Sequence, residues 1–207
     1  MVKDVHWLGH ASFKITGEKV LYIDPWKLKG TEEKAHIILI THDHYDHCSE
    51  DDVEAIISES TIIVAPFDAA GKFKGNVKKV RPGDKLEVSG IKIEVVPAYN
   101  TDKSFHPKGK NWVGYVVELN KKRIYHAGDT DLIPEMENLK NIDIALLPVS
   151  GTYVMEAREA AQAAQKIKPA VAVPMHYGAG VVGTEKDALT FKELLGGEVE
   201  VEILSKS

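Results

Sequence analysis

The sequence predicts an α/β (α+β) fold in which two β-sheets pack face to face and helices cover their outer faces, one domain in four layers. Three observations lead to this prediction. Short apolar runs of strand length dominate the first part of the chain, later strands alternate with helices, and neither a linker nor a short-period repeat divides the chain. Because 207 residues is within the usual size of one domain, we expect a single domain over residues 1–207.

The first third of the chain is predicted to be mainly sheet. Residues 5–15 and 19–24 form short strands around a turn, and residues 35–40 are an apolar run of strand length. Ser49 precedes three acidic residues, which is typical of a helix start because the serine caps free N–H groups and carboxylates suit the positive end of the helix dipole. Residues 61–65 then return to strand.

The rest of the chain alternates between the two kinds of element. In residues 156–168 the alanines and one isoleucine fall on a single helical face, and Pro169 ends the helix. A second helix, 184–195, stops at two glycines. The remaining predicted strands are 91–96, 112–119, 122–125, 142–147, 170–173 and 199–204.

Composition excludes several classes of protein. A net charge of −5 argues against nucleic acid as a partner, because binding to phosphates needs a basic face, and the lysines between residues 103 and 110 are interpreted as a solvated loop. No apolar run is long enough to cross a membrane, and the N-terminus lacks the pattern of a secretory signal. The single cysteine, Cys48, is interpreted as buried packing. We expect a cytoplasmic protein with a small-molecule substrate; the sequence leaves the oligomeric state open.

A dense group of potential metal ligands follows the predicted strand at 35–40. His42, His44, Asp46 and His47 lie within six residues, and the spacing of the first two puts their side chains on one side of extended backbone. Three imidazoles and a carboxylate are more than one tetrahedral zinc ion needs from a single loop. We therefore expect two divalent metal ions and additional ligands from distant parts of the chain, with zinc favoured and manganese or iron as alternatives.

The run Thr-His-Asp-His-Tyr-Asp-His at 41–47 resembles the signature of the metallo-β-lactamase superfamily. The segments Gly-His-Ala-Ser-Phe at 9–13, Ile-Asp-Pro at 23–25, Tyr-His-Ala-Gly-Asp-Thr at 125–130 and Val-Pro-Met-His-Tyr-Gly at 173–178 are similar to its L-ascorbate-6-phosphate lactonase-like branch. The resemblance implies a four-layer αββα sandwich with the metals at one edge of the two sheets. It also implies the following roles: His42 and His44 hold the first metal, Asp46, His47 and His176 hold the second, and Asp129 bridges both.

The third ligand of the first metal departs from the branch pattern. Where the branch has Pro-Ala-aromatic-His, this chain has Pro-Ala-Tyr followed by Asn100. We expect His106, six residues on, to fold back and ligate the metal. Asn100 or a water in this position, and a site that does not use this loop, are the alternatives.

Two further residues have open roles. Asp24 ends a strand; it either orients a ligand imidazole from the second shell or stabilises the turn. His10 lies in the Gly-His-Ala-Ser turn and is either a donor to substrate or a turn-stabilising residue. The other histidines, His6, His36 and His126, are interpreted as strand residues.

Two metals about 3.5–4 Å apart can activate a shared water as hydroxide, so the expected reaction is hydrolysis of a small phosphorylated, lactone or other ester-type substrate. Asp46 is expected to be catalytic because it would hydrogen-bond that hydroxide while ligating the second metal. The alternatives are a metal-dependent phosphodiesterase or nuclease, and a non-catalytic metal-binding sensor or scaffold.

Overall fold

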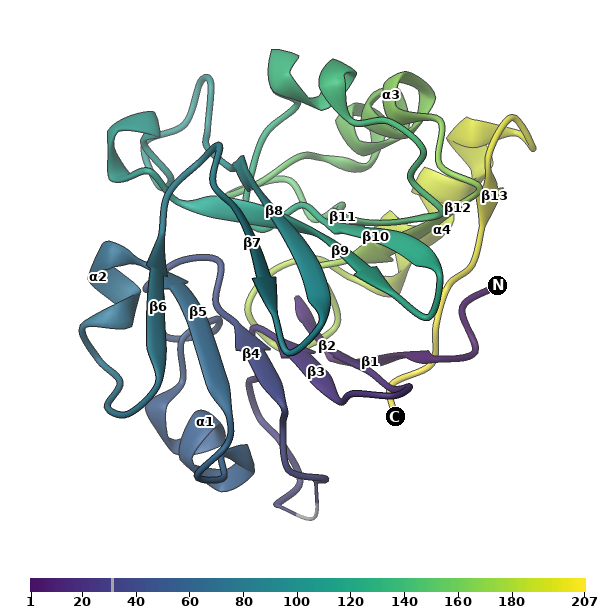
Figure 1. Cartoon of the computed structure of the whole chain (residues 1–207). Helices are drawn as coiled ribbons and strands as arrows, with labels where there is room; N and C mark the ends of the chain where they lie inside the picture. Colours follow the sequence, from purple (N-terminus) through teal and green to yellow (C-terminus); the bar gives the residue numbers. More distant parts are fainter. Residues whose placement is uncertain (31) are drawn as a thin grey trace.

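The computed structural model describes residues 1–30 and 32–207, and within them it has two β-sheets with helices on their outer faces (Figure 1). The first sheet has the strand order β1-β2-β3-β4-β5-β6 and the second β13-β12-β11-β10-β9-β8-β7. The first sheet consists of β1 (Val5–Gly9), β2 (Ser12–Ile15), β3 (Leu21–Ile23), β4 (Ile37–Leu39), β5 (Ile62–Pro66) and β6 (Val77–Val80). The second consists of β7 (Lys85–Val88), β8 (Ile91–Pro97), β9 (Val113–Leu119), β10 (Lys122–His126), β11 (Ile144–Pro148), β12 (Val171–Met175) and β13 (Glu200–Val201).

The helices are divided between the two outer faces. The helices α1 (Glu50–Ile56) and α2 (Phe67–Ala70) cover the first sheet, while α3 (Ala157–Ile167) and α4 (Glu185–Leu195) cover the second (Figure 1). Two short 3-10 helices, Lys108–Lys110 and Pro134–Asn138, lie in connections of the second half. The predicted four-layer arrangement is therefore confirmed. No helix in the described part of the chain is long and apolar enough to cross a membrane.

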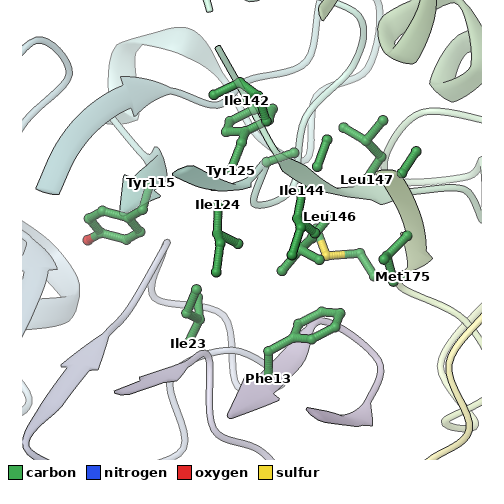
Figure 2. Close-up of a cluster of buried hydrophobic side chains, with 14 of the residues drawn as sticks. Phe13, Ile23, Tyr115, Ile124, Tyr125, Ile142, Ile144, Leu146, Leu147 and Met175 are labelled. Carbon is green, nitrogen blue, oxygen red and sulfur yellow. The ribbon is translucent and has the colours of Figure 1, made fainter. Parts of the chain in front are cut away.

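The main core lies between the two sheets. Figure 2 shows Phe13 and Ile23 of the first sheet pointing toward Ile124, Leu146 and Met175 from the second. These side chains are at most 2% exposed, so each gives up nearly all its contact with water. Burial of one such side chain contributes about 1.5–3 kcal/mol to the stability of the fold. The packing therefore fixes the position of one sheet relative to the other.

A smaller core lies between the first sheet and α1. In β4 the side chains of Ile37 and Leu39 join the main core, whereas Ile38 points to the opposite face and packs with Val53 and Ile56 of α1. Successive residues of a strand face opposite sides, so a strand covered on both faces is apolar throughout. Cys48 belongs to this smaller core, and burial raises the pKa of its thiol to about 12, in agreement with the packing role.

The structure differs from the predicted elements where the apolar signal is weak. Residues 5–15 are not one strand but a hairpin that turns at His10, whose φ is +54°. The strands β6 and β7 were not predicted, because their side chains are mostly exposed and include several lysines. Lysines on an edge strand discourage pairing with other chains, and β6 and β7 are edge strands. The last strand is only Glu200–Val201, shorter than the predicted 199–204.

The candidate site residues follow the carboxyl ends of strands. Asp24 follows β3, the 41–47 loop follows β4, Asn100 lies beyond β8, Asp129 beyond β10, and His176 directly follows β12. Parallel pairing of β3 with β4, and of β10 through β12, brings these ends to one edge of each sheet. This placement is typical of ligand sites in sheets with parallel strands.

Candidate metal centre

Two groups of potential metal ligands meet at this edge. In the first, one ring nitrogen from each of His42, His44 and His106 lies within 4.8 Å of the others. In the second, the ligand atoms of His10, Asp46, His47 and His176 lie within 4.8 Å of one another. The structure thus brings the predicted ligands of both metal positions together, although they come from segments up to 134 residues apart in the sequence, from His42 to His176.

Asp129 lies between the two groups. Its Oδ2 is 3.0 Å from His176 Nε2, 3.3 Å from His106 Nε2 and 4.0 Å from His42 Nε2. Its Oδ1 is 3.4 Å from His47 Nε2. One carboxylate therefore faces imidazoles of both groups, which is the placement that the bridging role requires.

Two imidazoles of the 41–47 loop, those of His42 and His47, are oriented by hydrogen bonds from Nδ1 to oxygen atoms. The Thr41 hydroxyl donates its one proton to Asp24 Oδ2 at 2.6 Å. The oxygen of the same hydroxyl lies 2.9 Å from His42 Nδ1, so it accepts a hydrogen bond from that nitrogen. His47 Nδ1 lies 2.8 Å from Asp24 Oδ2 and donates to that carboxylate. With each Nδ1 protonated, each Nε2 carries the lone pair that a metal needs. Asp24 also accepts the Thr41 backbone N–H at 2.8 Å, so this one carboxylate both orients His47 and holds the loop.

The distant ligands are held in the same way. His106 Nδ1 lies 3.2 Å from Asn100 Oδ1 and 3.2 Å from the Tyr153 carbonyl, and His176 Nδ1 lies 2.8 Å from Ser150 Oγ. In each case Nε2 faces Asp129. Among the described residues, the buried side-chain atoms without a hydrogen-bond partner are His10 Nδ1, His42 Nε2, His47 Nε2, His106 Nε2 and Asp129 Oδ1. Four of these five atoms face the space between the two groups, and a buried polar atom without a partner is costly unless a ligand binds it. The donor set therefore fits divalent metal ions.

The electrostatics of the centre agree with this fit. Burial lowers the pKa of His42 and of His44, which favours the neutral imidazole that ligates a metal. Burial opposes charge on His47 as well, but the Asp129 and Asp24 carboxylates outweigh it and hold its pKa well above the usual value. Burial likewise opposes ionisation of Asp129, yet His176 and His47 lower its pKa well below the usual range. The negative charge of the buried carboxylates is thus stabilised by positive charge among these imidazoles, and a bound cation would supply that positive charge.

His10 lies behind Asp46 rather than in the cavity. Its side chain is fully buried, and its Nε2 is 3.1 Å from Asp46 Oδ2. Burial lowers the pKa of His10 to about 4, so it contacts Asp46 as a neutral ring. Of the two predicted roles, donation to substrate has no support in this geometry. His10 supports Asp46 and the turn, and its backbone carbonyl accepts the N–H of His176 at 2.8 Å.

The loop that carries His106 is anchored by Asn100 and by Asp131, of which Asp131 was not singled out from the sequence. Asn100 Oδ1 accepts the backbone N–H of His106 at 2.9 Å, and Asn100 Nδ2 donates to Asp131 Oδ1 at 3.0 Å. Asp131 is fully buried and also accepts from the Thr101 N–H at 2.8 Å and from Lys103 Nζ at 2.6 Å. Asn100, where the family pattern has histidine, therefore positions His106 instead of replacing it.

The lysines of this region lie in a largely exposed loop, as predicted, and they also form ion pairs; Lys103 alone is partly buried. Lys103 contacts Asp131, Lys108 contacts Glu135 at 3.1 Å, and Lys110 lies 3.8 Å from Asp68. A sequence pattern could not show these pairs, because their carboxylates lie at least 27 residues away.

Two aromatic residues fix neighbouring parts of the centre. The Trp112 ring lies 5.0 Å from His42, 4.8 Å from His44 and 5.6 Å from His106, measured between ring centroids. His126 Nε2 donates to the Ala11 carbonyl at 2.9 Å, and its Nδ1 accepts the Gly128 N–H at 3.1 Å. His126 is thus a strand residue, as predicted, but it also ties the turn of His10 to the segment of Asp129.

A cavity of about 240 Å³ opens above the centre. Its floor is formed by His44, Asp46, His106, Asp129 and His176, and its walls by Tyr45, Phe105, Tyr153 and Val181. The metal-binding groups are therefore accessible to a small molecule, whereas His10 and Asp24 are fully buried and lie outside the lining.

Comparison with known proteins decides the family. Residues 4–176 match the model of the β-lactamase superfamily domain. The chain belongs to the metallo-β-lactamase superfamily. It is 40% identical to a UPF0173 metal-dependent hydrolase of Thermococcus onnurineus, over 99% of this chain and 96% of the relative. It is also 36% identical to a metal-dependent hydrolase of Parabacteroides distasonis whose crystal structure superposes with a TM-score of 0.86, covering 96% and 91% of the two chains.

A metallo hydrolase of Ignicoccus hospitalis shares the fold, with a TM-score of 0.79, 24% identity and coverage of 98% and 95% of the two chains. These comparisons confirm the predicted superfamily and fold, and they identify the chain as a metal-dependent hydrolase. The more specific L-ascorbate-6-phosphate lactonase-like branch stays a prediction.

Proposed function

We propose that this superfamily member is a binuclear hydrolase, with zinc as the favoured metal, that cleaves a small ester-type substrate. The observation that carries the proposal is the position of the Asp129 carboxylate between two groups of imidazoles. His42, His44 and His106 would hold one ion, and Asp46, His47 and His176 the other, with Asp129 shared. Imidazole-rich ligation suits zinc, while manganese or iron in the position with more carboxylate oxygen is the alternative.

When bound, the metal ions supply a Lewis acid and lower the pKa of water, which are the requirements for hydrolysis at neutral pH. The residues of the chain supply the rest. Asp46 is placed to accept a proton from the attacking water, because Oδ2 is held by His10 and the carboxylate lines the cavity floor. Asp24 and Asn100 would keep imidazoles in their ligating orientation.

A phosphodiesterase that acts on nucleic acid is less well supported. The net charge is −5, and the residues that line the cavity, all of them described, include neither lysine nor arginine. A non-catalytic metal sensor was suggested by the irregular third ligand. The contact of Asn100 with His106 argues against the sensor, because it holds an imidazole beside those of His42 and His44.

The test is hydrolysis by protein stripped with a chelator and then reloaded with zinc or manganese. We expect the stripped protein to be inactive and the reloaded protein to hydrolyse at least one member of a panel of aryl esters, lactones, thioesters and phosphodiesters. The loss should be at least about 10²-fold, since the metals supply the nucleophile and the Lewis acid. A reloaded protein that binds metal but cleaves no member of the panel would favour the sensor.

A further inference from the structure

The walls of the cavity differ in character from its floor. Tyr45, Phe105, Tyr153 and Val181 surround the opening above the imidazoles and carboxylates. Tyr45 is 68% exposed and Phe105 46% exposed, and large apolar side chains this exposed lose free energy in water unless something covers them. Both are at the mouth of the same small cavity, so a ligand bound at the metals covers them.

The aromatic walls are held in place. The rings of Phe105 and Tyr153 meet edge to face, with centroids 4.7 Å apart, and the ring of Tyr45 contacts Trp26 at 6.0 Å in the same geometry. Edge-to-face contact of this kind is a favourable geometry for aromatic rings. Tyr153 is also fixed through its carbonyl, which accepts from Asn100 Nδ2 at 2.9 Å. The surface offered to a ligand is therefore a preformed apolar slot.

The walls contain no positive charge. Neither lysine nor arginine occurs among the lining residues, all of which lie in the described part of the chain. The ammonium groups of three lysines in neighbouring loops are bound elsewhere: Lys103 to Asp131 at 2.6 Å, Lys27 to the Ala179 carbonyl at 3.1 Å, and Lys72 to the Asp43 carbonyl at 2.6 Å. A phosphate or carboxylate on the part of the substrate remote from the metals would find no cationic side chain among these lining residues.

We propose that the substrate carries an uncharged apolar or aromatic substituent, which binds between Phe105, Tyr153 and Val181 while its reacting group lies at the metals. This proposal depends on the proposed function only for the position of the substrate's reacting group at the metals. The cavity of about 240 Å³ has room for a small substituent such as a phenyl ring or a short alkyl chain. The substrate class is a neutral aryl or alkyl ester or lactone, and a charged group on the part of the substrate remote from the metals is disfavoured.

The experiment measures binding rather than turnover. The zinc-loaded protein is titrated calorimetrically with acetohydroxamate, benzohydroxamate and 4-carboxybenzohydroxamate, which share one zinc-binding group and differ in the substituent. We expect benzohydroxamate to bind at least about tenfold more tightly than acetohydroxamate, and Phe105→Ala to remove most of this ratio. Phe67→Ala is the control, because Phe67 is 63% exposed on α2 and lies outside the cavity lining.

Because Phe105 is next to His106 in the sequence, a second variant changes a residue elsewhere in the lining. Val181→Lys places an ammonium group in the cavity lining and should improve 4-carboxybenzohydroxamate relative to benzohydroxamate by about tenfold. Equal binding of acetohydroxamate and benzohydroxamate, no binding of either, or no response to Val181→Lys would overturn the apolar slot. A protein that prefers benzohydroxamate but hydrolyses no ester, lactone, thioester or phosphodiester would refute the proposed function and leave the slot supported.

Discussion

Replacing Asp46 by alanine is expected to lower kcat/KM by at least about 10²-fold, because in the mechanism that we propose the carboxylate serves both as a proton acceptor and as a metal ligand. Its side chain lies on the cavity floor, and its Oδ2 contacts His10 at 3.1 Å. The fold should survive, since the residue belongs to a loop and to neither hydrophobic core. The measurements are steady-state kinetics on a substrate found with the metal-loaded protein, circular dichroism and thermal unfolding.

Asp43→Ala is the matched control for Asp46→Ala. Asp43 is an aspartate of the same loop that lies outside the cavity lining, and we expect its removal to change kcat/KM by less than about threefold. An Asp46→Ala protein that retains activity within about threefold of the original would contradict the catalytic role, because a group that positions a nucleophile contributes far more.

Replacing His106 by alanine is expected to weaken the binding of one zinc ion by at least about tenfold and to leave the other site nearly unchanged. The reason is geometric: His106 Nε2 lies 3.3 Å from Asp129 Oδ2, and it is the third imidazole of the group that contains His42 and His44. Two imidazoles and a shared carboxylate form a poor zinc site. Zinc titration in the presence of a competing chelator measures both sites.

Asn100→Ala distinguishes ligation from positioning. Asn100 holds His106 through two contacts to the same Oδ1, at 2.9 and 3.2 Å, so its loss should weaken the same zinc site, but less than loss of the imidazole does. Asn138→Ala, at an exposed residue remote from the centre, should have no effect. An Asn100→Ala effect larger than that of His106→Ala would place the ligand at Asn100.

Much of the fold could be predicted from apolar patterning. The runs at 35–40 and 142–147 are buried on both faces, and the alanine face of 156–168 packs on the second sheet, so the sequence signal and the burial agree. Strands with few buried side chains lack this apolar pattern. Lys78 and Lys79 in β6 are exposed and only Val80 is buried, so no periodicity marks this strand.

The local part of the site was also predictable, because four potential ligands lie within six residues and share one loop. The parts that depend on tertiary packing were not. Nothing in the sequence near Asp131 indicates that it anchors the loop of His106, since its partners at 100–103 lie about 30 residues away. The role of His10 could not be assigned either. Its contact with Asp46 joins a hairpin turn to a loop that lies 36 residues further along the chain.

If Asp129 joins two metal positions in one centre, as we propose, the metal content of the protein should show it. The protein is stripped, reloaded with excess zinc, freed of unbound metal and measured by elemental analysis against its concentration from amino-acid analysis. We expect about two zinc ions per chain, because the imidazoles on both sides of Asp129 provide ligands for two. A value near one, or near zero with zinc and with manganese alike, would contradict it.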